Sequence, residues 1–416
     1  MFSVFINAWK VKDIRTKILY VLLLLLIYRL GAHIPLPNIS FSALETIKNS
    51  GQDQSIYSII AGGGVGSIFA MGIGPYITSS IIMQLLCVAI PKLEALQKEG
   101  EEGRKKINQY TRVVAVALAA LQGAGTVYSL RYAFVNQNWL TYIMATVALI
   151  TGTIFIMWLS ELLTEKAIGN GSSFIIFANI LSGLPGAVGM LYATGTGTNI
   201  TGWFKVIAIL LIFVCVMAFV VLIQDGERRI PVQYSKKMVG RQMFGGQTSY
   251  IPIKVNIAGV MSIIFAISLL QFPATINQFV QSTKLTTVVK ALSIHQPIGA
   301  VLYILLIFMF TFFYTSFAVN PVEMAENMKK NGGFIPGIRP GKPTSEYIQR
   351  TVDRMSWIGA FFYAVIAMAP VLLQWIFNVQ VGFGGTTLLI VTGVALEIVK
   401  QLESQLLMRH YKGFLG

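Results

Sequence analysis

The chain has 416 residues; 55% of them are hydrophobic, 12% are charged, and the mean hydropathy is +0.67. A soluble protein of this length could not bury so much apolar surface, so the composition excludes an ordinary soluble fold and indicates that lipid is the solvent. The formal net charge of +15 comes from 32 Lys and Arg against 17 Asp and Glu. We therefore expect a membrane protein with basic segments on one side of the bilayer.

The first 17 residues are predicted to form a short helix at the membrane interface, on the cytoplasmic side. Apolar side chains recur there at helical spacing, at Phe2, Phe5, Ile6 and Trp9. The basic residues that follow and the leucine run at 22–26 imitate a secretory signal peptide. The apolar run continues without a small-residue cleavage pattern, so we interpret it as a retained first span.

Ten segments are apolar and long enough to cross a bilayer as helices. They lie near Ile18–Ile34, Ile68–Ile90, Val113–Tyr132, Trp139–Leu159, Phe174–Leu191, Trp203–Ile223, Ile257–Phe279, Pro297–Val319, Trp357–Phe377 and Phe383–Val399. The predicted fold is therefore an all-α polytopic membrane protein with ten transmembrane helices. An N-terminal half of five spans occupies residues 18–192, a C-terminal half of five spans occupies residues 193–400, and residues 401–416 form a cytoplasmic tail.

The positive charges predict the orientation of these spans. An even number of spans places both termini and one set of loops on the same side. Of the 32 Lys and Arg residues, only a few fall in the other set of loops: Arg29, Lys48, Arg131, Lys205, Lys284 and Lys290. Because basic residues concentrate in cytoplasmic loops, we expect both termini to be cytoplasmic.

Three predicted cytoplasmic segments are unusually long and basic, at 91–112, 224–256 and 320–356. One explanation is orientation of the spans together with contact with anionic lipid. The other is docking of a large acidic or phosphate-rich partner, such as ribosomal RNA or a motor protein. Charge alone leaves both explanations open.

Two predicted spans contain helix-breaking residues. The second span carries the string GIGPYI at 72–77, with several glycines just before it, so it cannot be one regular helix. In the matching seventh span, Gly259 and Pro273 flank a second predicted irregular stretch. Irregular backbone at membrane depth occurs around a cavity or inside protein, and paired interruptions are typical of an inverted repeat. We therefore expect two pseudo-symmetric, inverted halves of five spans with a functional centre between them.

The spans contain almost no charge at their centres. Charged residues lie near the predicted span ends, where side chains reach the interface, at Arg29, Glu161, Asp225 and Glu397. The polar residues deeper in the bundle are amides, namely Gln84, Gln122 and Asn256. An ion-coupled transporter would need a mid-membrane charge, and an intramembrane enzyme would need a nucleophile or a metal set. The three histidines are scattered, so the sequence predicts no metal site, cofactor or catalytic residue.

Eight strings, in order along the chain, carry a resemblance to a known family. They are YRLGAHIPLPN (28–38), SIFAMGIGPYITSSIIMQLL (67–86), KEGEEGRKKINQYTR (98–112), GNGSSFIIFANI (169–180), KVNIAGV (254–260), FPATI (272–276), FIPGIRPG (334–341) and FGGTTLLIV (383–391). Together they resemble the SecY family, the channel subunits of the bacterial Sec protein translocase, across essentially the whole chain.

The resemblance implies a multi-pass protein of the bacterial cytoplasmic (inner) membrane that catalyses no reaction. It would be a passive channel for unfolded polypeptide, with a central pore between its two halves. The implied partners are the small subunits SecE and SecG, the SecA ATPase or a translating ribosome with its ribosomal RNA, and anionic lipid. The implied substrates are signal peptides and nascent chains.

Channels of this family close at a ring of apolar side chains. The matching positions here are Ile73, Ile77, Ile176, Ile264 and Ile390, which we call the isoleucine ring. Such a constriction would exclude water and ions yet yield around a passing chain. The family's lateral gate lies between spans 2 and 3 on one side and spans 7 and 8 on the other. Its polar positions are matched by Gln84, Gln122 and Asn256.

Two further sites follow from the resemblance. The external plug segment corresponds to residues 55–67, with the matching positions Ile60, Gly62, Gly63, Gly64, Val65 and Gly66. It is about two residues shorter than in familiar relatives and richer in glycine, which predicts a short or loose plug helix. Arg339 matches an arginine that engages SecA and the ribosome, with Arg228, Arg229 and Arg241 in the preceding basic loop.

Overall fold

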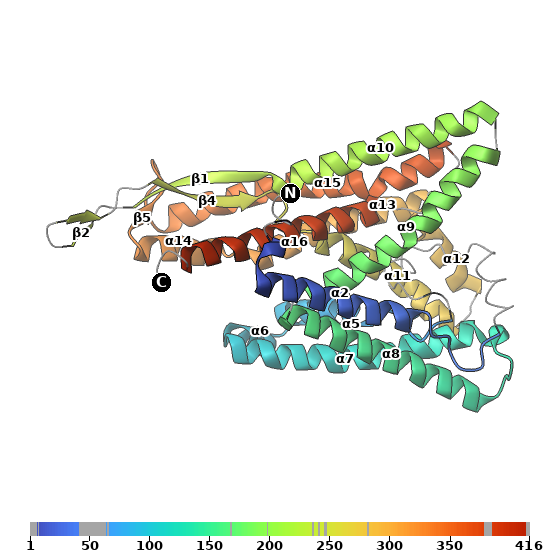
Figure 1. The fold of residues 1–416 in the computed structure, drawn as a ribbon. Helices are drawn as coiled ribbons and strands as arrows, with labels where there is room; N and C mark the ends of the chain where they lie inside the picture. Colours follow the sequence, from blue (N-terminus) through green and yellow to red (C-terminus); the bar gives the residue numbers. More distant parts are fainter. Residues whose placement is uncertain are drawn as a thin grey trace.

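The computed structural model of the chain describes residues 6, 8–40, 64, 66–166, 169–197, 199–234, 237–239, 242–244, 248–280, 283–377 and 385–412. The fold is mostly helical, and its long helices lie side by side as one elongated bundle (Figure 1). Strands β1 (Glu227–Tyr234), β4 (Thr248–Lys254) and β5 (Gly333–Phe334) lie at one end of the bundle, and helix α12 (Thr283–Ala291) lies at the other.

The N-terminal half contains the helices that precede the chain's midpoint. They are α2 (Lys12–Ala32), α5 (Gly74–Ala89), α6 (Pro91–Lys98), α7 (Glu101–Ser129), the short 3-10 helix η2 (Arg131–Ala133), α8 (Trp139–Lys166) and α9 (Gly171–Gly197). α7 packs between α5 and α8, and α2 lies against α8. α9 connects to the second half by packing against α10 and α16.

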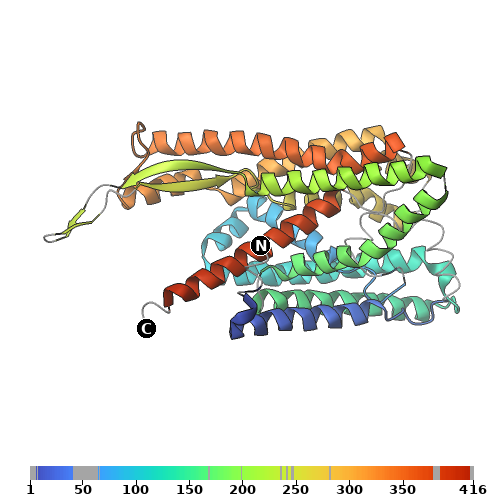
Figure 2. The ribbon, with the colours of Figure 1, turned by 45° about the horizontal axis from the view of Figure 1, so that its top comes forward.

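The C-terminal half contains α10 (Asn199–Asp225), α11 (Met261–Val280), α12 (Thr283–Ala291), α13 (Pro297–Ala318), α14 (Pro321–Lys330), α15 (Lys342–Phe377) and α16 (Gly385–Lys412). α13 packs between α11 and α15, and α16 contacts α9, α10 and α15. Figure 2 shows α16 crossing the bundle diagonally between the two groups of helices. The second contact between the halves is made by α11, which packs against α7 and α5.

Each of the ten predicted spans overlaps one of these helices. By length and apolar composition, five helices within the described ranges could cross a membrane, or six if α5 and α6 form one span bent by 102°. The arrangement of ten spans in two inverted halves therefore remains a prediction. The outward surface agrees with a lipid environment: on α10, for example, Phe204 is 73% exposed and Leu222 is 71% exposed.

The two predicted interruptions have different outcomes. α5 begins only at Gly74, after turns that include Gly72 at a φ of +51°, so the second span is interrupted as predicted. The predicted irregular stretch between Gly259 and Pro273 is wrong, because α11 is helical from Met261 through Pro273 to Val280. The backbone is unusual only at Gly259, with a φ of +61°. A proline inside a span is tolerated where neighbouring helices hold it in place.

The predicted basic loops contain regular structure. α6 and the start of α7 occupy most of 91–112. In a three-stranded sheet, β1 (Glu227–Tyr234) pairs antiparallel with β4 (Thr248–Lys254) on one side and β5 (Gly333–Phe334) on the other. A two-stranded ribbon, β2 (Lys237–Val239) with β3 (Gln242–Phe244), extends from it.

The sheet joins two basic segments that are far apart in the sequence, 224–256 and 320–356. Ile230 and Val232 of β1 are buried together with Met328 of α14 and Ile348 of α15. These contacts are possible because β1 alternates exposed and buried residues. The two segments therefore form one small folded unit at the end of the bundle, which we call the sheet unit.

The N-terminal segment lies against α16. Residues 8–10 are helical, and α2 begins at Lys12. Residues 12–17 of the predicted interfacial helix therefore belong to the same helix as the first span. Ala8 and Ile14 are buried in one small cluster with Leu402 of α16. α16 itself continues to Lys412, so the predicted tail at 401–416 is helical over most of its length.

Candidate functional site

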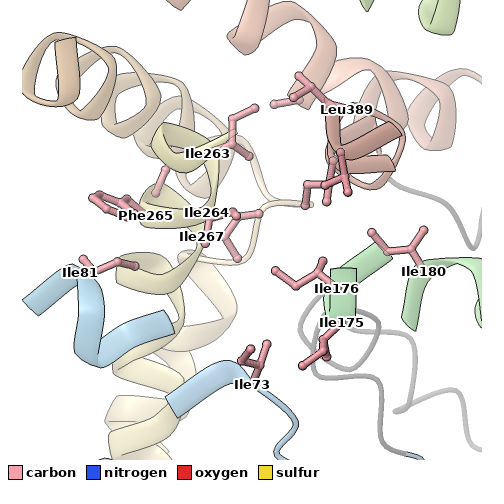
Figure 3. Close-up of a cluster of buried hydrophobic side chains, with 14 of the residues drawn as sticks. Ile73, Ile81, Ile175, Ile176, Ile180, Ile263, Ile264, Phe265, Ile267 and Leu389 are labelled. Carbon is pink, nitrogen blue, oxygen red and sulfur yellow. The ribbon is translucent and has the colours of Figure 1, made fainter. Parts of the chain in front are cut away.

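The predicted isoleucine ring lies in the centre of the bundle. Ile73, Ile176, Ile264 and Ile390 are all less than 8% exposed and belong to one hydrophobic cluster, and Ile77 packs against that cluster. Figure 3 shows Ile73, Ile176 and Ile264 approaching one another from three separate elements. Residues from the start of α5 and from α9, α11 and α16 therefore converge at one place.

Local backbone geometry fixes the α5 residues of this cluster. Ile73 is the N-cap of α5, and Pro75 occupies the first turn, where its missing N–H and fixed φ are favourable. Gly72 adopts the left-handed region that the preceding turn requires. Ile77 lies one turn after Ile73, on the same side of the chain. The GIGPYI string thus positions two isoleucines at the bundle centre.

A cavity of about 450 Å³ adjoins this cluster. Ile176, Ile264 and Ile390 form part of its apolar lining. The remaining lining is partly polar and includes Gln224 at the end of α10 and Glu397 on α16. The centre of the bundle therefore combines a buried apolar cluster with a cavity whose lining is partly apolar and partly polar.

The three predicted gate amides lie at different places. Gln84 lies on α5, where its Nε2 donates to Ser80 Oγ at 3.3 Å. Gln122 lies on α7, where its main-chain oxygen accepts a hydrogen bond from Thr126 Oγ1. Asn256 lies in the segment before α11 and lines the central cavity. Among the elements of the predicted gate, α11 packs against both α5 and α7.

Most of the predicted plug lies outside the described residues, including Ile60, Gly62, Gly63 and Val65. Gly64 is exposed and Gly66 is buried with a φ of +85°. The main chain at residues 66–68 pairs with the residues at and just after the end of the first span. Leu36 N donates to Gly66 O at 2.7 Å, and Ile68 N donates to Ile34 O at 3.0 Å. This pairing fixes the chain as it enters the turns before Ile73.

The predicted partner-binding arginines lie on the sheet unit. Arg228 and Arg229 are exposed on β1, where Arg229 pairs with Glu227 at 2.7 Å. Arg339 is exposed in the loop between β5 and α15, and its main-chain oxygen accepts a hydrogen bond from Thr344 Oγ1 at 2.9 Å. Because β5 pairs with β1, these arginines belong to one folded unit. Arg241 lies outside the described residues.

Within the described part of the chain, no group of three or more His, Cys, Asp or Glu side chains could hold a metal ion. Cys87 is buried in α5 and Cys215 is exposed on α10, and both are free thiols. The isoleucine cluster is apolar, and the cavity beside it is lined by apolar, amide and charged side chains. Such groups can exclude water, form hydrogen bonds and move apart.

Comparison with known proteins decides the family. A family model described as SecY matches residues 67–399. The chain belongs to the SecY family. It is 42% identical over 438 residues to the protein translocase subunit SecY of Streptomyces galbus, and the match covers 100% of both chains.

Solved structures agree on the fold. A SecY protein whose plug domain is described as stabilising the closed state of the translocation channel matches with a TM-score of 0.65 at 20% identity, over 92% of this chain and 90% of that one. Sec61 in the canine ribosome-channel complex from the endoplasmic reticulum matches with a TM-score of 0.59 at 17% identity, over 92% and 91%. The fold is therefore that of SecY and Sec61 channels.

Part of the polar lining of the cavity was not predicted from the sequence. Glu397 and Gln401 lie four residues apart on α16 and face the same hollow, together with Gln224. Glu397 was interpreted as a span-end residue that reaches the interface, and its spacing from Gln401 was the available signal. Gln224 lies at the end of α10, where an amide is an ordinary interfacial residue.

Proposed function

We propose that this chain is the channel subunit of a protein translocase, which passes unfolded secretory polypeptides across the membrane and inserts membrane proteins into it. It would act as a passive channel and not as an enzyme. Membership of the SecY family supports this proposal, because full-length relatives are named protein translocase subunit SecY. The substrates would be signal peptides and nascent chains in an extended state.

The observation that carries the proposal is the convergence of the isoleucine ring. Five isoleucines that are scattered over more than 300 residues of sequence meet in or against one buried cluster. A narrow apolar layer excludes water and therefore ions, whereas flexible aliphatic side chains can move aside for a polypeptide. The cavity next to the ring would receive the chain before it crosses this layer.

A sideways opening would deliver apolar segments to lipid. The contact of α11 with α5 and α7 is the place where the two halves touch on this side of the bundle, and α13 packs on α11. Separation of α5 and α7 from α11 and α13 would open the channel to the bilayer. A segment could then partition by its own hydrophobicity, as insertion scales describe. Gln84 and Gln122 would lie beside that path, and Asn256 at its inner end.

The driving force and the partners would come from outside the chain. The exposed arginines of the sheet unit suit a partner that carries carboxylates or phosphates, such as the SecA ATPase or ribosomal RNA. One structurally similar protein, Sec61, was solved in a ribosome-channel complex. SecE and SecG would complete the translocon in the bacterial cytoplasmic membrane. Other basic residues would contact anionic lipid.

The proposal is tested by hydrating the isoleucine ring. Ile77, Ile176 and Ile264 are replaced together with serine, and the resting ion conductance of the translocon is measured across planar bilayers without a translocating chain. Serine hydroxyls would admit water to the constriction, so the variant should conduct ions far more than the original protein. A single replacement should have a smaller effect, because neighbouring side chains fill part of the gap.

A matched control replaces Ile81, Ile180 and Ile263 with serine. These isoleucines are buried in the same hydrophobic cluster but are not ring positions. The control loses at least as much buried apolar area, because Ile77 is only partly buried whereas all three control isoleucines are buried. Thermal unfolding in detergent therefore reports any general loss of stability. If the ring variant and the control conduct equally, these isoleucines are packing residues and the barrier lies elsewhere.

A further inference from the structure

A cationic side chain is held between two aromatic rings at the turn that connects α7 to α8. Arg131 lies in η2, and its guanidinium carbon is 4.8 Å from the ring centroid of Tyr128 and 4.7 Å from that of Tyr132. Arg131 Nη2 also donates a hydrogen bond to Tyr132 Oη at 2.7 Å. Two cation–π contacts and a hydrogen bond restrict the orientation of the planar guanidinium. We call Tyr128, Arg131 and Tyr132 the arginine cluster.

The residues that follow fix the backbone of this turn. Ala133 and Phe134 are buried in one hydrophobic cluster. Ser40 N donates to Ala133 O at 2.8 Å, and Val135 N donates to Asn38 O at 3.0 Å. The turn is therefore tied to the chain that follows the first span, and the arginine cluster keeps its position relative to the N-terminal half.

The guanidinium of Arg131 has no carboxylate partner among the described residues. No ion pair within the described ranges involves it, and the sequence contains no Asp or Glu between Glu102 and Glu161. Tyr132 accepts from only one of its nitrogens, whereas a guanidinium has five N–H groups. The remaining N–H groups match the oxygens of a phosphate or a carboxylate, which a guanidinium binds through two parallel hydrogen bonds.

The surface around this turn is aromatic and apolar. Tyr132 and Trp139 are each 74% exposed, and Val135 and Leu140 are exposed as well. The exposed apolar surface continues along the helices, for example at Val147 of α8. Exposed aliphatic side chains of a span face acyl chains, whereas Tyr and Trp gather at the level of the headgroups. The arginine cluster therefore lies where the lipid-facing surface ends.

The turn lies at the end of the bundle where α12 also lies, opposite the sheet unit (Figure 1). The predicted orientation places the sheet unit in the cytoplasm, so this turn would lie at the external leaflet. A small anion dissolved in water would match the guanidinium but would leave the exposed rings and aliphatic side chains in water. A phospholipid matches both, because its phosphate lies next to a glycerol and two acyl chains.

We propose that Arg131 binds the phosphate group of a phospholipid in the external leaflet. Tyr128 and Tyr132 position the guanidinium, and the exposed side chains of Val135, Trp139 and Leu140 contact the glycerol and the upper part of the acyl chains. An anionic lipid such as phosphatidylglycerol is bound more tightly than phosphatidylcholine, because the positive charge of choline opposes that of Arg131.

A lipid bound here holds the external end of α7 at the membrane surface. α7 is one of the helices that would separate from α11 in the proposed lateral opening, so the lipid gives the N-terminal half a fixed point while α11 moves. The lipid site goes beyond the proposed function and does not depend on it. Its test accordingly measures lipid binding without any translocating chain.

The test uses the complete translocon in nanodiscs of phosphatidylcholine that contain an increasing mole fraction of isotopically labelled phosphatidylglycerol. A photoreactive amino acid replaces Val135, which is exposed next to the arginine cluster. Mass spectrometry then measures the yield of the covalent adduct with the labelled lipid. The mole fraction that gives half of the maximal yield reports the affinity of the site.

Arg131→Gln should raise this half-maximal mole fraction about three- to tenfold, the effect of losing an exposed charge-assisted hydrogen bond. Tyr132→Leu keeps the charge but removes the ring and the hydroxyl that position it, so it should cause a smaller increase. The matched control is Lys290→Gln, which removes the same charge from an exposed position on α12, at the same end of the bundle. It should leave the half-maximal mole fraction unchanged.

Equal half-maximal mole fractions for the original protein and Arg131→Gln would overturn the site. Equal increases in Arg131→Gln and Lys290→Gln would also overturn it, because only the total charge at this end would then matter. None of the replaced side chains is buried, so thermal unfolding in detergent should be the same for all variants.

Two further measurements test the choice of a lipid as the ligand. Millimolar inorganic phosphate should leave the adduct yield unchanged, and loss of the adduct would assign the site to a free anion. In native membranes, position 135 should cross-link to lipid. A cross-link to a polypeptide in place of lipid would assign this surface to a protein partner and overturn the proposal.

Discussion

At the residue scale, a few glycines determine how closely the elements of the channel approach one another. Gly152 of α8 is one of them, because a Cβ added there would overlap the main-chain oxygen of Ile68. Ile68 belongs to the segment that leads into the turns before Ile73. A contact with backbone cannot be relieved by rotating a side chain. Gly152 therefore controls the position of the chain that enters the isoleucine ring.

Gly152→Ala should push this segment away from α8. Overpacking of this kind costs about 1–3 kcal/mol, so thermal unfolding in detergent should occur at a lower temperature, and resting ion conductance should rise. Gly183→Ala on α9 is the matched control, because nothing lies within 4 Å of its added Cβ. That control should leave both properties unchanged. A Gly152→Ala protein with normal stability and conductance would show that the segment has room to move.

The proposed role of Arg339 is to engage a partner. It lies between Gly337, with a φ of +82°, and Gly341, with a φ of +104°, in a loop that few other sequences could form. Arg339→Glu should reduce translocation driven by SecA or by a ribosome at least tenfold, since reversing a charge at an interface costs several kcal/mol. The measurement is protected preprotein in proteoliposomes.

The control for Arg339 is Arg350→Glu, which makes the same charge change at an exposed position on α15. It should have a smaller effect, because it lies outside the loop. Equal defects in both variants would mean that only the total charge of the basic segment matters, and normal translocation by Arg339→Glu would contradict the role.

At the element scale, the contact between α11 and the pair α5 and α7 predicts where the channel opens to lipid. Cys87 and Cys215 are first replaced with alanine. Cysteine pairs are then placed across Ile77–Ile81 of α5 and Ile263–Ile267 of α11, with Cα separations of about 4.4–6.8 Å that suit a disulfide. Oxidation should stop both translocation and insertion, and reduction should restore them.

A second pair of cysteines tests whether the position of the bond matters. α13 and α15 pack against each other within one half, so a disulfide between them should leave translocation intact. Efficient insertion of signal sequences by the locked α5–α11 protein would place the lateral opening elsewhere.

The elements also show what the sequence could and could not predict. Each apolar run that was predicted to be a span overlaps a helix. The interruption before α5, predicted from Gly72 and Pro75, is also confirmed. The irregular stretch predicted from Pro273 was wrong, because neighbouring helices can hold a proline that would break an isolated helix. The sheet of β1, β4 and β5 was not predicted, because its β1–β5 pair joins residues about 100 positions apart and short strands carry a weak local signal.

At the scale of the whole molecule, family resemblance and local sequence pattern contributed differently to the prediction of the site. The five isoleucines are ordinary apolar residues in any single span, and only the resemblance grouped them. The structure then brought them to one cluster. Nothing in the sequence grouped Gln224 with Gln401, because their proximity depends on how α10 and α16 pack against each other. Contacts between distant elements are therefore the part that sequence reasoning missed.

Orientation in the membrane is a property of the whole molecule, and it follows from the distribution of Lys and Arg. Ser345 at the start of α15 is partly exposed, and Asn136 between α7 and α8 is exposed. The predicted topology places Ser345 in the cytoplasm and Asn136 outside. Cysteines introduced singly at these positions, in a protein without Cys87 and Cys215, should therefore differ in their reaction with a membrane-impermeant maleimide added to intact spheroplasts.

We expect labelling of Asn136→Cys and none of Ser345→Cys until the membrane is permeabilised, after which both should react. The physical reason is that the basic segments near Ser345 are retained on the cytoplasmic side, where the membrane potential and anionic lipid favour positive charge. The reverse pattern would invert the topology and place the exposed arginines of the sheet unit away from any cytoplasmic motor or ribosome. The partner-binding role of Arg339 would then fail with it, whereas the isoleucine ring would keep its place at the centre of the bundle.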